Sequence, residues 1–174
     1  MKATRGITAS LAVLAMAAAG CGKSAAVPKE FCGVPVKQGN LAPLLPDSKK
    51  FKNWNDSSAA EYADCDLTAD GSRVLSVTIK QVPKPLGPDD WVDVRGSKPG
   101  ARRSVSFPGT AVISADEALV TADCGHPTPY VLFRVLNFRK DQPEKYAAET
   151  QELQRFVEDF VPQITERIGC EKTR

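Results

Sequence analysis

The sequence has few of the residues and motifs from which catalytic and metal sites are built. Its 174 residues include a single histidine, His126, and no Cys-x-x-Cys pair, which argues against zinc-ribbon and thioredoxin-like sites. The Gly-x-Ser-x-Gly elbow, the Walker loop and the Gly-x-Gly-x-x-Gly turn are all missing, and with them the common hydrolase and nucleotide-binding signatures. We therefore predict no catalytic residue, no metal site and no cofactor, and hence a protein that is not an enzyme.

A net charge of one sign is also lacking. The chain has 23 basic and 21 acidic side chains, and loss of Lys2 and Arg5 with an N-terminal leader would make the two numbers equal. A nucleic-acid-binding protein usually carries a clustered basic excess, so we expect no nucleic-acid partner. After the leader, no apolar run approaches about 18 residues, the length from which a membrane-spanning helix is inferred.

The N-terminus has the pattern of an export signal. Lys2 and Arg5 precede an uncharged stretch from Ile7 to Ala19 that is rich in alanine, leucine and valine, and small residues end it. This combination is typical of a secretory signal peptide. We therefore predict a signal peptide over residues 1–20.

The end of this leader, Ala18-Ala19-Gly20-Cys21, resembles the lipobox of bacterial lipoproteins. The resemblance implies a diacylglyceryl group on the Cys21 thiol and cleavage just before that residue. The sequence departs from the commonest lipobox, because Ala18 stands where leucine is usual. Ordinary cleavage after Ala19, giving simple secretion, is the alternative. Two acyl chains suffice for a stable anchor, so the resemblance implies attachment to the membrane through Cys21.

The cysteine count fits an exported protein. Lipidation of Cys21 would leave four cysteines, and four cysteines in an oxidising compartment favour two disulfides. Three connectivities are possible, and the sequence alone does not choose among them. We prefer Cys32–Cys65 with Cys124–Cys170, because each bridge then joins two points in one half of the chain.

The rest of the chain suits one domain. We expect a flexible tether over residues 21–30 and a single disulfide-stapled domain over 31–174. Within that domain, the segment from Asn40 to Pro46 fits one helical turn that ends at Pro46, and the segment 49–54 is polar with two aromatic residues. Val74 to Val82 alternates apolar and polar residues and predicts a strand, preceded by an Asp70-Gly71 turn.

Further strands are predicted after a long loop from Val82 to Gly100. These segments are Ser104–Phe107, Ala111–Ser114, Ala118–Thr121 and Tyr130–Phe138. The last is apolar on both faces, which favours a central position in the sheet.

The strongest helix prediction runs from Glu144 to Ile168. An apolar stripe along it contains Leu153, Phe156 and Phe160; Pro162 should kink or split the helix, and Gly169 should end it. Strands followed by a helix indicate an α+β fold: an antiparallel sheet of four to six strands packed by a long C-terminal amphipathic helix.

The lipobox, the four further cysteines, Leu44-Leu45-Pro46, Ala118-Leu119-Val120 and the terminal helix together resemble small actinobacterial envelope lipoproteins. These motifs are structural, and the resemblance covers most of residues 21–174. It implies exposure at the outer face of the plasma membrane and supplies no activity.

Three groups of residues have a functional interpretation beside a plainer one. Cys124-Gly125-His126 could be a reactive or zinc-binding pair, but Cys124 is expected in a disulfide and His126 in a surface turn. Asp89, Asp90 and Asp93 could bind calcium, but they lack the loop spacing of known sites and suit a helix start instead. Arg95 to Arg103 holds four cations that could contact anionic lipid or cell-wall polymer, or simply form a solvated loop.

Three functions follow from these observations. The first is a non-enzymatic binding or scaffold module at the membrane surface, whose partner is an envelope protein or cell-wall polymer. The second is a carrier of a small apolar ligand held in a pocket between the helix and the sheet. The third is a hydrolase without a recognisable motif.

Overall fold

A computed structural model of the chain describes residues 25–59, 62–82, 101–124, 130–137 and 146–170. The first elements are β1 (Glu30–Phe31), β2 (Val34–Pro35), the short helix α1 (Gln38–Leu41) and the 3-10 turn η1 (Ala42–Leu44). The strands of the main sheet are β3 (Phe51–Ala59), β4 (Tyr62–Ala69), β5 (Ser72–Val82), β6 (Ala101–Arg103), β7 (Gly109–Ile113), β8 (Glu117–Asp123) and β9 (Tyr130–Asn137). The helix α2 (Tyr146–Arg167) comes last.

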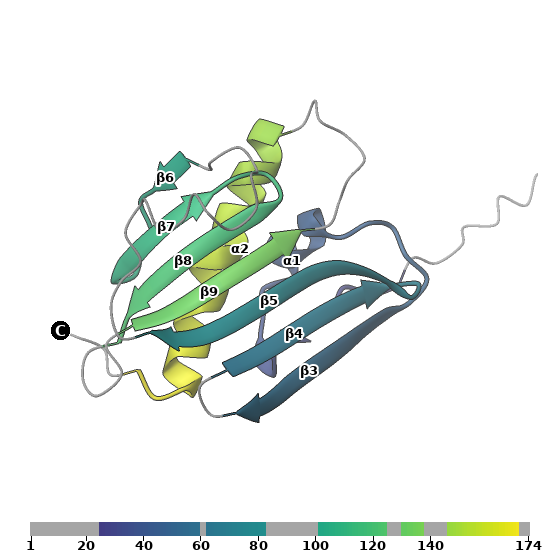
Figure 1. Ribbon diagram of the computed structural model, residues 1–174. Helices are drawn as coiled ribbons and strands as arrows, with labels where there is room; N and C mark the ends of the chain where they lie inside the picture. Colours follow the sequence, from purple (N-terminus) through teal and green to yellow (C-terminus); the bar gives the residue numbers. More distant parts are fainter. Residues whose placement is uncertain (1–24, 60–61, 83–100, 125–129, 138–145, 171–174) are drawn as a thin grey trace, which may run out of the picture.

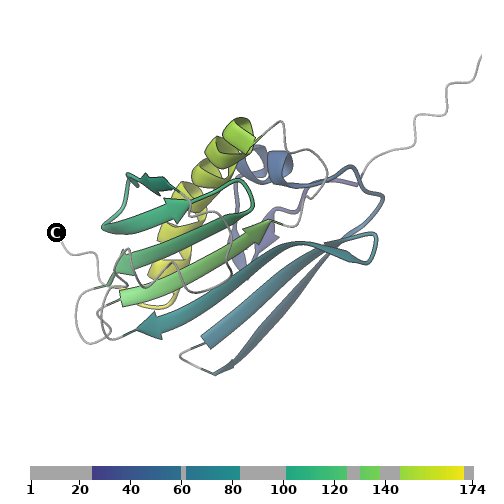
Figure 2. The same ribbon diagram turned by 45° about the horizontal axis from the view of Figure 1, so that its top comes forward.

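The described strands form an antiparallel sheet with helical elements on one side. Seven strands pair in the order β3-β4-β5-β9-β8-β7-β6, and β1 pairs with β2 in a separate hairpin. The helix α2 crosses one face of the sheet, and it contacts α1, η1 and β2 on that same side (Figures 1 and 2). The α+β class, the antiparallel sheet and the C-terminal helix are confirmed. The predicted count of four to six strands is wrong, because the main sheet has seven.

The strands β3 and β4 are absent from the prediction. Their sequences are rich in aspartate and asparagine, which are depleted in strands, so segment 49–54 gave no strand signal. These segments form strands because they pair with a neighbouring strand, although their intrinsic strand propensity is low. The Asp70-Gly71 turn has positive φ at both residues (49° and 91°), as a two-residue type I′ hairpin requires, and it folds β4 onto the strongly apolar β5.

The strands β5 and β9 lie where the apolar pattern predicts. Leu75 and Val77 of β5 are fully buried toward α2, as are Phe133 and Val135 of β9. In β5 these residues share one face of the sheet with Ile79, as the predicted alternation requires, but Val74 and Ser76 on the other face are also buried. β9 is the fourth of the seven strands and is therefore central, as expected.

The prediction of a strand at Ser104–Phe107 is wrong. The strand β6 lies earlier, at Ala101–Arg103, and Arg103 pairs with Ala111 across the sheet. The residues from Ser104 to Pro108 connect β6 to β7. Val105 and Phe107, which alternate with polar serines, are both partly buried against the core. A connecting segment with this burial has the same apolar–polar alternation as a strand, so the sequence pattern alone does not distinguish the two.

The helix α2 packs through a cluster of phenylalanine rings. Phe156 and Phe160 stack with centroids 5.2 Å apart, and Phe31 from β1 lies 5.7 Å from Phe160. The helix continues through Pro162, so of the two predicted outcomes, a kink or a split, the split does not occur. Gly169 has φ of +79° and ends the helix, as predicted. The amide of Cys170 donates to the carbonyl of Thr165, five residues earlier, at 2.8 Å, which is the 6→1 hydrogen bond of a Schellman cap.

Two disulfides join the helical layer to the sheet. Cys32, in the turn of the β1–β2 hairpin, is bonded to Cys65 of β4, and Cys170, after α2, is bonded to Cys124, after β8. These are the pairs that we prefer from the sequence. Both bridges connect the same two layers, because each one joins one end of the helical layer to the sheet.

The N-terminal edge of the described chain also contacts the domain. The amide of Ala25 donates to the Ser48 carbonyl at 2.6 Å, and Val27 packs against the core. The contacts of the domain therefore begin before residue 31, within the stretch for which we expect a tether. Among the described residues, no helix is long and apolar enough to cross a bilayer.

Candidate functional site

Most residues with a functional interpretation from the sequence lie outside the described residues. These are Cys21, His126 and the three aspartates Asp89, Asp90 and Asp93. The same holds for the first part of the basic segment, including Arg95 and Lys98, and for most of the expected loop from Val82 to Gly100. The lipidation, the possible Cys124–His126 pair and the calcium interpretation therefore stay predictions.

The end of the basic segment is described, and it is a strand. Arg102 and Arg103 are both exposed in β6, but adjacent residues of a strand point to opposite faces of a sheet. Arg102 pairs with Val112 and Arg103 with Ala111, whose side chain is buried under α2. These two cations therefore do not form one patch.

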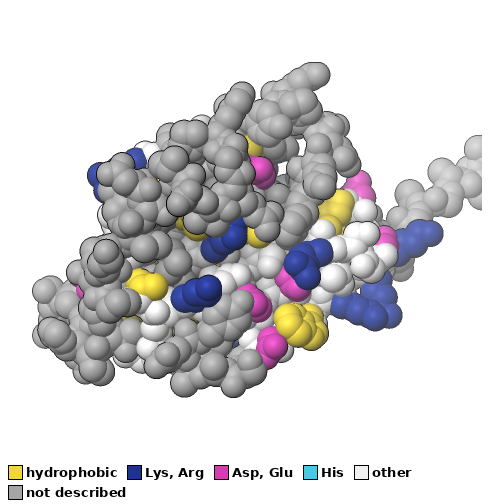
Figure 3. Space-filling model, in the orientation of Figure 1, with side chains coloured by type: hydrophobic (Ala, Val, Ile, Leu, Met, Phe, Trp, Pro, Cys, Tyr) yellow, Lys and Arg dark blue, Asp and Glu magenta, His cyan; other side chains and the backbone are white. Residues whose placement is uncertain are grey.

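The sheet face opposite α2 carries many of the polar side chains of the central strands, and we call it the open face. One row of paired residues crosses all seven strands there: Asp56, Asp64, Thr78, Arg134, Leu119, Val112 and Arg102. The adjacent row starts on β3 and contains Trp54, Asp66, Ser76, Leu136 and Glu117. Figure 3 views the molecule from this side and shows basic and acidic side chains interspersed.

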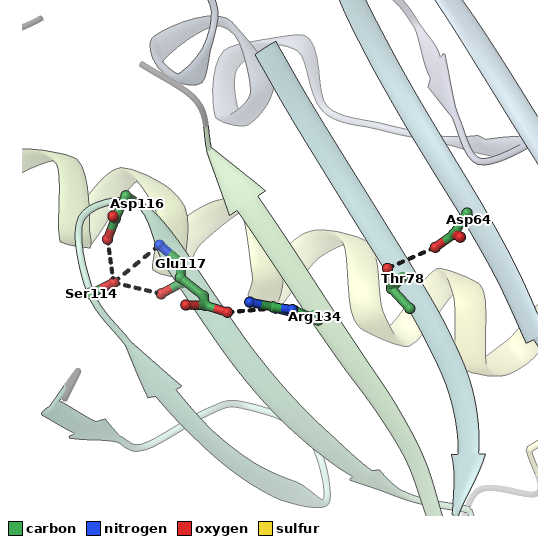
Figure 4. Close-up of polar contacts among 6 residues, drawn as sticks. All are labelled: Asp64, Thr78, Ser114, Asp116, Glu117 and Arg134. Atoms are coloured by element: carbon green, nitrogen blue, oxygen red, sulfur yellow. Dashed lines mark hydrogen bonds and ion pairs between the residues drawn. The ribbon is translucent and has the colours of Figure 1, made fainter. Parts of the chain in front are cut away.

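The β3–β4 end of the open face is acidic and contains an exposed tryptophan. The side chain of Asp64 accepts a hydrogen bond from the Thr78 hydroxyl at 2.7 Å (Figure 4). Asp66 pairs with Arg73 at 3.1 Å, and Asp56 lies directly opposite Asp64 in the strand register. Trp54 is 53% exposed, one of two large apolar side chains that stand out to solvent in the described chain.

The middle of the open face holds a half-buried ion pair. The Nε of Arg134, on β9, donates to Glu117 Oε1 on β8 at 2.6 Å. Glu117 is itself fixed by the β7–β8 turn, where the Ser114 hydroxyl accepts from the Glu117 amide at 3.0 Å (Figure 4). The Ser114 hydroxyl also lies 2.8 Å from Asp116 Oδ1. The guanidinium is therefore held in a fixed direction.

Two polar atoms near this ion pair have no hydrogen-bond partner within the described structure. They are Nη2 of Arg134 and Oγ1 of Thr121, and both are buried. Thr121 lies two residues after Leu119 on β8, and Leu119 is paired with Arg134, so the two atoms belong to neighbouring positions of the open face. A buried polar group without a partner is unfavourable, so these two atoms cost the fold some stability.

The open face offers groups that could contact another molecule. In the described ranges, no group of three or more His, Cys, Asp or Glu side chains could hold a metal ion. The open face offers carboxylates, guanidinium groups, hydroxyls and an indole ring on a rigid sheet, which can hydrogen bond and pack against another molecule. Sequence reasoning missed this face because its residues come from strands that are far apart in the chain.

Comparison with known proteins gives no relative. No protein-family model, no curated protein and no solved structure matches this chain.

Proposed function

We propose that this protein is an exported lipoprotein, anchored to the outer face of the plasma membrane through Cys21, that binds another envelope protein on its open face. It acts as a binding or scaffold module and not as an enzyme. The N-terminal leader and the lipobox-like residues support the anchor, and the two disulfides suit an oxidising compartment.

The asymmetry of the sheet is the observation that carries the binding role. One face is closed by α2 with fully buried side chains, whereas the other exposes Trp54 among charged residues of both signs. Aromatic and arginine side chains with a polar surround are characteristic of the residues that anchor protein–protein contacts. Cell-wall polymer is the alternative partner, and the mixed charge of the face favours a protein over a polymer of one charge.

The alternative of an apolar ligand carrier is less favoured. A carrier would need an apolar cavity between the helix and the sheet. The rings of Phe31, Phe156 and Phe160 contact one another in that layer, and all three side chains are at most 1% exposed. These three rings therefore fill the space between the helix and the sheet in which an apolar ligand would have to bind.

The anchor is tested by metabolic labelling with a clickable fatty acid in the native host. We expect label on the wild-type protein and none on Cys21→Ala, which should appear outside the membrane fraction. Label that persists in Cys21→Ala, or wild-type protein without label, would contradict the anchor.

The binding face is tested by a matched pair of charge reversals. Lys80 is an exposed cation on the open face, and Arg155 is an exposed cation on α2. After chemical crosslinking in native membranes, Lys80→Glu should lose the crosslinked partner and Arg155→Glu should retain it. Loss with both variants or with neither would contradict recognition by the open face.

A further inference from the structure

We propose that two copies of this protein pair through their β3 edges, antiparallel and centred on Trp54, so that the two sheets become one continuous sheet. This inference does not depend on the proposed function. It rests on the hydrogen-bonding direction of β3 and on the order of its side chains.

β3 is an edge strand of the described sheet, and its outer backbone groups are not paired with another described strand. The amide of Asp70 donates to the Lys50 carbonyl at 2.9 Å, so Phe51 and Ala69 form a non-hydrogen-bonded pair. The register runs without a shift up to Asp56. The backbone amide and carbonyl groups of Asn53 and Asn55 therefore point away from β4, and they make no backbone hydrogen bond to the rest of the described chain. The side-chain amide of Asn53 donates to the Glu30 carbonyl at 2.9 Å.

Such an edge is a template for a further strand. β3 contains no proline that would block pairing, and Lys52, Asn53, Trp54 and Asn55 are all exposed. An added strand can bond only to the outward groups. In a symmetric antiparallel pair, Asn53 of one copy must therefore lie opposite an outward-facing residue of the other copy.

The side chains select the register among those that this rule allows. Centring on Trp54 pairs Asn53 with Asn55 of the second copy, brings the two indole rings together and places Lys52 opposite Asp56 twice. The registers centred on Asn53 or Asn55 put Trp54 opposite Lys52 or Asp56 instead. Opposite charges and aromatic rings directly across an antiparallel pair are both favourable, so the Trp54 register is preferred.

The same register makes a geometric prediction about distances. The central Trp54–Trp54 position would be a non-hydrogen-bonded pair, where the Cα atoms approach to about 4.5 Å and the side chains are closest. An interface of one strand per copy is small, at the low end of specific interfaces, so the dimer should depend on concentration.

Cysteine crosslinking of the full chain in native membranes tests the register. Trp54→Cys should give a disulfide-linked band at twice the monomer mass under mild oxidation, at least fivefold stronger than the band from Lys52→Cys. Lys52 should crosslink only when combined with Asp56→Cys. Equal bands from Trp54→Cys and Lys52→Cys would overturn the pairing, and so would a band at another mass, which would show a different protein at this edge.

A charge exchange separates loss of pairing from loss of folding. Lys52→Asp and Asp56→Lys should each reduce the Trp54→Cys crosslink several-fold, and the double exchange should restore it to near the level of Trp54→Cys alone. A double exchange that stays as weak as the single variants, with unchanged thermal unfolding, would overturn the proposal.

Discussion

The two faces of the seven-stranded sheet are made of the same strands but differ in almost every physical property. On the covered face, Leu75, Val77, Phe133 and Val135 are fully buried on the side of the sheet that carries α2. On the open face, the neighbouring positions of those strands hold Ser76, Thr78, Arg134 and Leu136. The comparison indicates that the covered face stabilises the fold. The open face also has buried positions, Ser76 and Thr121, so the binding role proposed above concerns its exposed residues such as Trp54 and Lys80.

The largest effect should come from a substitution that leaves a cavity under the covered face. Phe160→Ala removes a fully buried ring that packs on Phe31 and Phe156, and it should lower the free energy of unfolding by about 3–5 kcal/mol. Denaturant unfolding measures this. Phe160→Leu is the control and should lose much less. A loss below 1 kcal/mol for Phe160→Ala would show that the helix does not close the core.

The next largest effect should come from the bridges between the layers. The Cys32–Cys65 disulfide closes a separation of 33 residues, so the double variant Cys32→Ala/Cys65→Ala should lose about 3–4 kcal/mol in denaturant unfolding. The bridge from Cys124 to Cys170 spans 46 residues and should contribute a similar amount. Unchanged unfolding without either bridge would contradict their role as links between layers.

A moderate effect is expected at the half-buried ion pair of the open face. Glu117→Leu leaves the Arg134 guanidinium without its carboxylate, and the protein should lose about 2 kcal/mol of stability by thermal or denaturant unfolding. Glu117→Gln keeps an acceptor for Arg134 Nε and should lose less. If both variants are as stable as the wild type, the pair does not order the open face.

A smaller effect is expected at the Thr78–Asp64 hydrogen bond. Thr78→Val keeps the shape of the side chain and removes the donor, so stability should fall by about 1 kcal/mol. Thr78→Ser retains a hydroxyl and serves as the matched variant. A Thr78→Val protein as stable as the wild type would show that the hydrogen bond contributes nothing.

The covered face could be predicted from the sequence, because burial imposes a periodicity that is local in the chain. The alternation of Leu75, Val77 and Ile79 and the apolar stripe from Leu153 to Ile164 gave β5 and α2. β3 and β4 could not be predicted, since their aspartates and asparagines disfavour strands and the segments extend only because β5 offers a partner.

The open face could not be predicted either, and for a different reason. Its central row requires Thr78 of β5 to lie beside Arg134 of β9, and Leu119 of β8 to follow. That order depends on β9 entering the sheet between β5 and β8, which no local pattern encodes. The disulfide pairs show the same limit, because four cysteines allow three pairings and only the layers show why these two form.

The most direct test of the two-face account is site-specific photo-crosslinking in native membranes, with a photoreactive amino acid at Lys80 on the open face or at Arg155 on α2. Both side chains are exposed, so neither substitution should change stability by more than about 0.5 kcal/mol. We predict a crosslinked envelope protein from position 80 and none from position 155. A partner captured only from position 155, or equally from both, would contradict the account.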